Sequence, residues 1–205
     1  MQIADILQEF SILLAVIDPF GAVPIFIALG TSIPEERRTR VAVRAVLISG
    51  AILFSFIAVG QLFLEMVGVS MTSFQLAGSV VLFLFGLRMI FEDESFAGAA
   101  GPETKTDMQL AVYPLAIPTI AGPGGILAVV LLTDNRSTPV IEQLITTGLL
   151  ITVLVITLAC LLFATKIHRL IGDAGASILS RVMGLVVAAL AIEMGLDALS
   201  ARFGI

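Results

Sequence analysis

Residues 10–29 read FSILLAVIDPFGAVPIFIAL, and residues 111–132 read AVYPLAIPTIAGPGGILAVVLL. Each stretch is apolar and long enough to cross a membrane, yet each carries proline and glycine near its centre. Proline removes a backbone N–H and clashes with the preceding turn, and glycine relaxes the backbone. We therefore expect both helices to be broken at mid-membrane, where unwound backbone is tolerated only against protein or a water-filled cavity.

The composition of the 205-residue chain is that of an integral membrane protein. Hydrophobic residues make up 58% and charged residues only 13%, whereas a soluble domain has about 25% charged residues. We predict an all-α fold with one transmembrane domain over residues 1–205. The six expected spans are residues 10–29, 45–64, 69–90, 111–132, 144–163 and 182–199.

Other sequence features exclude several classes of protein. The first span is not expected to be a cleavable signal peptide, because Asp5 and Glu9 stand where a basic region belongs. The lone Cys160 lies inside the fifth span, which excludes a disulfide within the chain. No P-loop, HExxH or Ser/His/Asp set is visible, so we expect no enzyme, no catalytic residues, no metal and no cofactor. No basic and aromatic cluster indicates nucleic-acid binding.

The basic residues predict the orientation in the membrane. Of the 11 Lys and Arg residues, only Arg136 and Arg202 lie on the side of the even-numbered loops. Cytoplasmic loops carry an excess of basic residues, so both termini are expected outside. The residues on the predicted cytoplasmic side are Arg37, Arg38, Arg40, Arg44, Arg88, Lys105, Lys166, Arg169 and Arg181.

The two halves of the chain, about 1–91 and 108–205, resemble each other and would form an inverted repeat. Residues 77–81 (AGSVV) match residues 183–187 (MGLVV). In spans one and four, residues 18–21 (DPFG) align with residues 122–125 (GPGG), while an alternative register aligns the paired prolines of each span. The polar segment 92–107 is interpreted as a solvated cytoplasmic linker in preference to a partner-binding segment.

The dipeptides Asp18-Pro19 and Gly122-Pro123 are each expected to start a half-helix, because Asp or Gly suits the N-cap and Pro the first turn. The N–H groups and positive dipole ends of both half-helices would then suit an anionic group such as a substrate carboxylate. The alternative is that both clusters are structural kinks. The predicted substrate-binding residues are Asp18, Pro19, Gly21, Pro24, Pro118, Thr119, Gly122, Pro123, Gly124 and Gly125.

Two ionisable residues within spans are candidates for coupling to H⁺ or Na⁺. Asp18 lies in the middle of span one, and Glu193 lies inside span six. An ionisable group at membrane depth is costly and marks a functional site by default. Asp18 would alternatively cap its own helix or bind a substrate ammonium.

The motifs DPFGAVPIF at residues 18–26, PLAIP at 114–118 with AGPG at 121–124, and RVMG at 181–184 resemble those of MarC-family integral membrane proteins. The similarity covers essentially the whole chain. It implies a multi-pass protein of a prokaryotic cytoplasmic membrane, in a family named from an association with multiple antibiotic resistance. The family includes proteins described as small neutral amino acid transporters that handle glycine and alanine. It implies no ligand contacts, so the site residues rest on the half-helix argument.

The leading hypothesis is therefore a secondary transporter of small neutral amino acids. Two alternatives stay open: an exporter of other small solutes or drugs, and a non-transporting membrane protein that acts through partners. The expected partners are the lipid bilayer and a small-molecule substrate, without nucleic acid. The sequence does not predict an oligomeric state.

Overall fold

The computed structural model of the chain describes residues 2–30, 33–91, 106–134 and 138–204. Most of the predicted linker (92–105) and the basic residue Arg136 lie outside these ranges, and Asp107 already begins a helix. In chain order the helices are α1 (Ile3–Ile17), α2 (Ala22–Gly30), α3 (Glu35–Val67), α4 (Met71–Phe91), α5 (Asp107–Leu110), η2 (Ala111–Ile120), α6 (Pro123–Leu132), α7 (Val140–Leu162) and α8 (Ala164–Phe203).

The described part of the chain confirms an all-helical membrane fold. The segments that are long and apolar enough to cross a membrane are Ile3–Gly30, Glu35–Val67, Met71–Phe91, Val140–Leu162 and Ser177–Phe203. A sixth is added if the bent pair Asp107–Ile120 and Pro123–Leu132 counts as one span. Each of these overlaps one predicted span.

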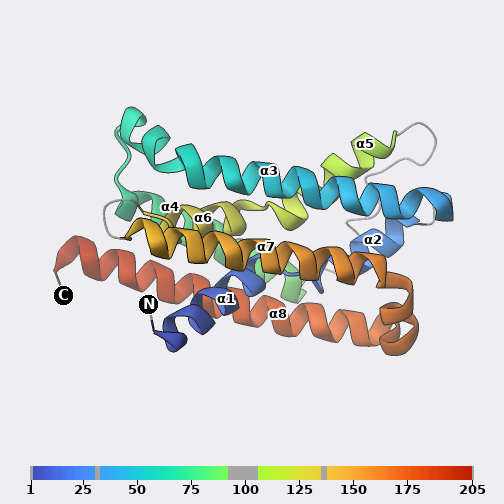
Figure 1. Cartoon of the computed structure of the whole chain (residues 1–205). Helices are drawn as coiled ribbons and strands as arrows, with labels where there is room; N and C mark the ends of the chain where they lie inside the picture. Colours follow the sequence, from blue (N-terminus) through green and yellow to red (C-terminus); the bar gives the residue numbers. More distant parts are fainter. Residues whose placement is uncertain (1, 31–32, 92–105, 135–137, 205) are drawn as a thin grey trace.

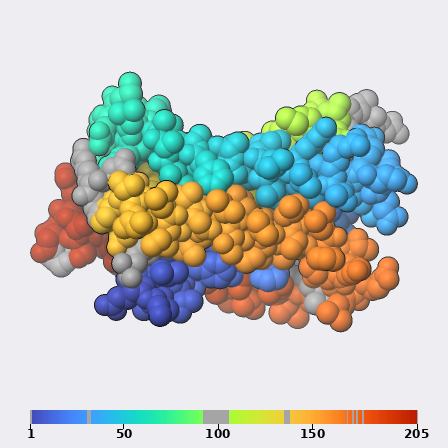
Figure 2. Space-filling view, viewed as in Figure 1, coloured from blue at the N-terminus to red at the C-terminus, as the bar shows by residue number. Residues whose placement is uncertain are grey.

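The long helices lie side by side in a bundle, and the two chain ends lie toward the same end of it (Figure 1). On the face shown in Figure 2, α3 and α7 run next to each other, and α5 lies beside the first residues of α3. The broken segments lie between the long helices: α1 packs against α6 and α7, and η2 packs against α3 and α2.

The outer surface of the bundle is apolar along the length of the long helices, as a lipid-facing surface must be. Leucine, isoleucine, valine and phenylalanine side chains that would be buried in a soluble protein are exposed here. They include Leu47, Leu62, Phe63, Val80, Leu84, Ile151, Val155 and Leu185.

Three buried hydroxyl groups in the spans are satisfied by their own helix. The hydroxyls of Ser49, Thr133 and Thr157 each donate to the carbonyl four residues earlier, at 2.6–2.8 Å. Such a bond meets the polar requirement of a buried Ser or Thr without a partner helix. These residues therefore need no functional explanation.

The backbones of helices α4 and α8 approach each other closely at Gly86 and Gly184. A Cβ added at Gly86 would lie 2.8 Å from the Ala188 nitrogen and 2.9 Å from the Gly184 oxygen. A Cβ added at Gly184 would lie 2.9 Å from the Gly86 oxygen. Small residues at helix interfaces allow this approach in membranes, where packing drives association.

We expect Gly86→Ala to destabilise the protein by about 1–3 kcal/mol, because the new methyl group meets backbone that cannot rotate away. The matched control is Gly148→Ala in α7, where a Cβ meets nothing within 4 Å. Alanine at that helical position is expected to be neutral or to stabilise by about 0.5–1 kcal/mol. Thermal unfolding of both variants in detergent measures the difference. Equal stability of the two variants would contradict the close packing.

Candidate functional site at two helix breaks

The first break lies at Asp18, where α1 ends. The Asp18 N–H donates to the Leu14 carbonyl at 3.1 Å, and Asp18 itself has φ +45°, in the left-handed region. Aspartate is one of the few non-glycine residues that adopt this conformation readily. The chain then turns through residues 19–21 before α2 begins at Ala22.

The Asp18 side chain caps the turn that leads into α2. Its Oδ1 accepts the Gly21 N–H at 3.0 Å, and its carbonyl accepts the Ala22 N–H at 3.2 Å. These two bonds match an N-cap, but α2 begins at Ala22 and not at Pro19 as we expected, so Asp18-Pro19 lies in a turn between the two helices. Asp18 is only 4% exposed, and its Oδ2 has no hydrogen bond within the described ranges. The break therefore holds a buried carboxylate with one oxygen free.

Glycine is required at position 21 by this cap. A Cβ there would lie 2.0 Å from Oδ2 of Asp18, so a side chain would push the carboxylate out of its place. The Gly21 N–H, which we expected to be available to a ligand, is instead donated to Asp18. A ligand at this break would meet the carboxylate, not the amide.

The second break follows η2, which carries Pro114 and Pro118. The residues before them, Tyr113 and Ile117, have extended backbone (φ −131° and −126°), as the residue before a proline prefers. Pro118 has no N–H for the Pro114 carbonyl, and the Thr119 hydroxyl donates to that carbonyl at 2.8 Å instead. In this conformation the Thr119 proton is already used, so Thr119 could only accept from a ligand.

Helix α6 begins as the Gly122-Pro123 pattern predicts, with Gly122 in extended conformation as N-cap and Pro123 in the first turn. Its first helical hydrogen bond runs from the Ile126 N–H to the Gly122 carbonyl, at 3.0 Å. The N–H groups of Gly124 and Gly125 precede it and have no acceptor among the described residues. Both glycines are buried, whereas Pro123 is exposed. The start of α6 thus offers two free amide donors just behind the accessible surface.

The two breaks lie against each other although about 100 residues separate them in the chain. A Cβ added at Gly124 would lie 3.6 Å from Cβ of Val16, and one added at Gly125 would lie 3.8 Å from Cγ1 of Ile17. Val16 and Ile17 form the last turn of α1, directly before Asp18. The structure therefore brings the end of α1 to the positive end of α6, with α6 bent by 57° from η2.

The other predicted site residues are distributed as follows. Pro19 and Gly122 are buried, and Pro24 and Pro118 are half-buried. Glu193 is exposed on α8. The structure thus places the last turn of α1, directly before Asp18, against Gly124 and Gly125.

Contacts made by Arg38 and Glu9 were missed by the sequence reasoning. The Arg38 guanidinium donates to the carbonyls of Gly30 (2.6 Å) and Ile33 (3.2 Å), which closes the C-terminal end of α2. A basic residue shortly after a helix end is a signal for such a cap. The Thr146 hydroxyl donates to the Glu9 carboxylate at 2.6 Å, joining α7 to α1.

Metal binding has no support from the described residues, where no three His, Cys, Asp or Glu side chains form a group that could hold an ion. The Asp18 carboxylate is a negative group, and the N-terminus of α6 carries the positive end of its helix dipole. A zwitterion carries the complementary pair of charges.

Comparison with known proteins gives matches along nearly the whole chain. The family model for "MarC family integral membrane protein" matches residues 3–203. A UPF0056 membrane protein of Methanocaldococcus jannaschii is 34% identical over 95% of both chains. A UPF0056 membrane protein of Pyrococcus abyssi is 31% identical over 98% of this chain and 99% of its own.

A relative from Escherichia coli, the UPF0056 inner membrane protein YhgN, is 30% identical over 94% of this chain and 95% of its own. No solved structure matches. The helical membrane fold, the family model and these relatives agree over the same residues. The chain belongs to the MarC family of integral membrane proteins.

Proposed function

We propose that the protein is a secondary transporter of small neutral amino acids, glycine and alanine above all, with its binding site at the two helix breaks. The observation that carries this proposal is the pair of buried Gly124 and Gly125 N–H groups without acceptors, packed against the end of α1. Buried amides are normally paired. A helix N-terminus that keeps them free at membrane depth suits an anionic ligand group.

An amino-acid zwitterion matches the chemistry of the site. Its carboxylate would accept from the Gly124 and Gly125 amides, and its ammonium would donate to Oδ2 of Asp18. The side chains around the two glycines favour a small substrate. A Cβ added at Gly124 would lie 2.4 Å from Leu82, and one added at Gly125 would lie 3.5 Å from Leu53; both leucines are nearly fully buried. Glycine and alanine carry little beyond the two charged groups.

The transport cycle we propose uses the two halves as inverted repeats that rock around the site, with both termini outside. Span one and span four would be the broken span of each repeat, broken at mid-membrane. Coupling to H⁺ or Na⁺ is assigned first to Asp18, which is buried in the break, and only second to Glu193, which is exposed. Ionisable groups within a membrane typically serve such pathways.

The test is flux of labelled glycine and alanine into proteoliposomes that contain the purified protein, with and without an imposed H⁺ or Na⁺ gradient. We expect uptake above that of protein-free liposomes, and faster uptake with the coupling gradient. A folded sample that moves neither amino acid would refute the substrate. Inhibition by other solutes but not by glycine would favour an exporter of those solutes instead.

A further inference from the structure

Helix α3 lies along the whole of the bent span formed by α5, η2 and α6. At the middle of α3, Cδ2 of Leu53 would lie 3.5 Å from a Cβ added at Gly125 of α6. Further along α3, a Cβ added at Gly60 would lie 2.8 Å from Cγ2 of Val130. Helix α3 also packs against α5 and η2. It therefore covers the second break on one side.

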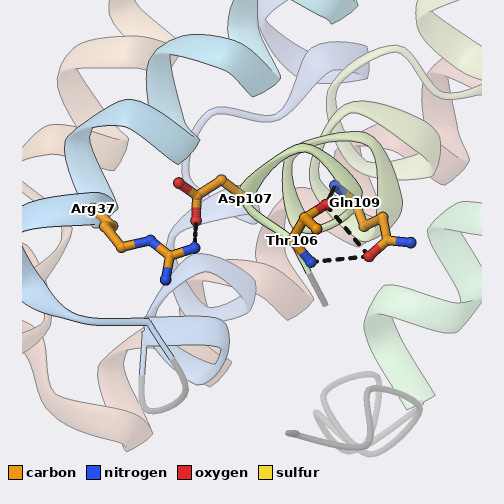
Figure 3. A network of polar contacts seen from close by, with 4 residues as sticks. All are labelled: Arg37, Thr106, Asp107 and Gln109. Carbon is orange, nitrogen blue, oxygen red and sulfur yellow. Dashed lines mark hydrogen bonds and ion pairs between the residues drawn. The ribbon is translucent and has the colours of Figure 1, made fainter. Parts of the chain in front are cut away.

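One end of α3 is held to this span by an ion pair. The Arg37 guanidinium donates to Oδ1 of Asp107, the first residue of α5 (Figure 3). Asp107 is buried, and a capping box between Thr106 and Gln109 fixes the turn that carries it, with the Thr106 N–H 2.9 Å from Oε1 of Gln109. The Asp107 carboxylate is thus presented to α3 by a rigid helix start.

The other end of α3 is held by a second polar contact. The Gln61 side-chain amide donates to Oδ1 of Asp134 at 2.6 Å, just beyond the end of α6. At 1.5 Å per residue, Gln61 and Arg37 are about 36 Å apart along α3. This separation spans the roughly 30 Å hydrocarbon core, so the two contacts lie at opposite membrane surfaces.

Between these two polar contacts, the contact of α3 with the bent span at Leu53 and Gly125 is apolar. The middle consists of a buried leucine against a glycine, which allows small rotations without loss of a hydrogen bond. The two ends are polar, and at one of them the exposed guanidinium of Arg37 meets the buried Asp107, so water reaches part of that contact. A helix held in this way separates from the neighbouring span more easily at either end than at its middle.

We propose that Arg37–Asp107 and Gln61–Asp134 are the two gates of the pathway, and that α3 pivots on Gly125 to open one end at a time. In the structure both contacts are formed. That the gates lead to an amino-acid site rests on the proposed function, whereas the pivoting of α3 does not depend on it.

The test uses Cys160 as a reporter, because it is the only cysteine of the chain, is buried, and lies in α7, which packs against α3. In sealed vesicles of known orientation, a membrane-impermeant maleimide is added from the side of Arg37. We expect Arg37→Ala and Asp107→Asn to speed Cys160 labelling about two- to fivefold, a change typical of losing a partly exposed ion pair. Gln61→Ala should have this effect only for reagent added from the opposite side.

The controls separate the gate from a general loosening of the fold. Ser55 is exposed on α3 and donates to the Ile52 carbonyl of its own helix, so Ser55→Ala should leave labelling unchanged. The double variant Arg37→Asp with Asp107→Arg restores the pair in reverse and should return labelling toward the wild-type rate. Thermal unfolding confirms that each variant is folded.

The outcomes distinguish this proposal from the proposed function. Unchanged labelling in both folded single variants at Arg37 and Asp107, with glycine flux present, would overturn the gates and leave the transporter standing. Faster labelling that the reversed pair corrects, without flux of either amino acid, would support the gates and refute the substrate. Labelling that rises equally from both sides in every variant would also overturn the gates.

Discussion

We expect Asp18→Asn to lower the glycine flux by about 100-fold while the protein stays folded. Asparagine adopts the left-handed conformation as readily as aspartate and keeps an oxygen for the Gly21 N–H, so the cap survives. Only the negative charge is removed, and with it the proposed partner of the substrate ammonium. Loss of one member of a buried charge pair commonly has an effect of this size. Initial flux in proteoliposomes is the measurement.

Two further variants serve as comparisons for Asp18→Asn. Asp197→Asn removes a charge from an exposed position on α8 and should leave the flux unchanged. Asp18→Ala loses the cap as well as the charge, and should lower stability by about 1–2 kcal/mol in addition. If Asp18→Asn were as active as the wild type, the Asp18 carboxylate would be a cap alone and its binding role would be refuted.

Replacement of Gly122 by alanine is expected to have the largest effect on stability at the site. A Cβ there would lie 2.3 Å from the carbonyl oxygen of Pro118, and backbone cannot move aside as a side chain can. We expect a loss of about 3 kcal/mol, which lowers the Tm by about 6–12 °C. Glycine flux should be lost too, because the first turn of α6 must shift. Thermal unfolding in detergent and flux are measured on the same preparation.

The matched variant lies three residues further along α6. A Cβ at Gly125 would lie 3.4 Å from the Ile120 carbonyl oxygen and 3.5 Å from Leu53, which is ordinary contact. Gly125→Ala should therefore unfold close to the wild-type temperature. A Gly122→Ala protein as stable as Gly125→Ala would contradict the backbone geometry of the second break.

The fold class was predictable from the sequence because membrane insertion depends on properties that are local in the chain. Apolar segments of about 20 residues identify the spans wherever they pack. The helix start at Gly122 was predictable for the same reason, since capping and proline chemistry act within a few residues. The described spans and the start of α6 agree with these expectations, whereas the helix expected from Asp18-Pro19 begins only at Ala22.

The sequence did not predict which polar groups pair across the bundle. The Arg37–Asp107 and Gln61–Asp134 contacts join residues about 70 positions apart, and no local pattern relates them. The same holds for Thr146 and Glu9. Only the geometry shows that the Gly21 N–H and the Thr119 hydroxyl already donate to acceptors within the breaks.

The sequence by itself thus determined the apolar spans, their helical form and the residue at which α6 begins, because these follow from hydropathy and short-range backbone chemistry. Only the tertiary structure decided that the end of α1 meets the start of α6, and that the amides of Gly124 and Gly125 have no acceptor among the described residues. The physical reason is that such contacts depend on how whole helices pack against one another, which is set by the shapes of many side chains at once.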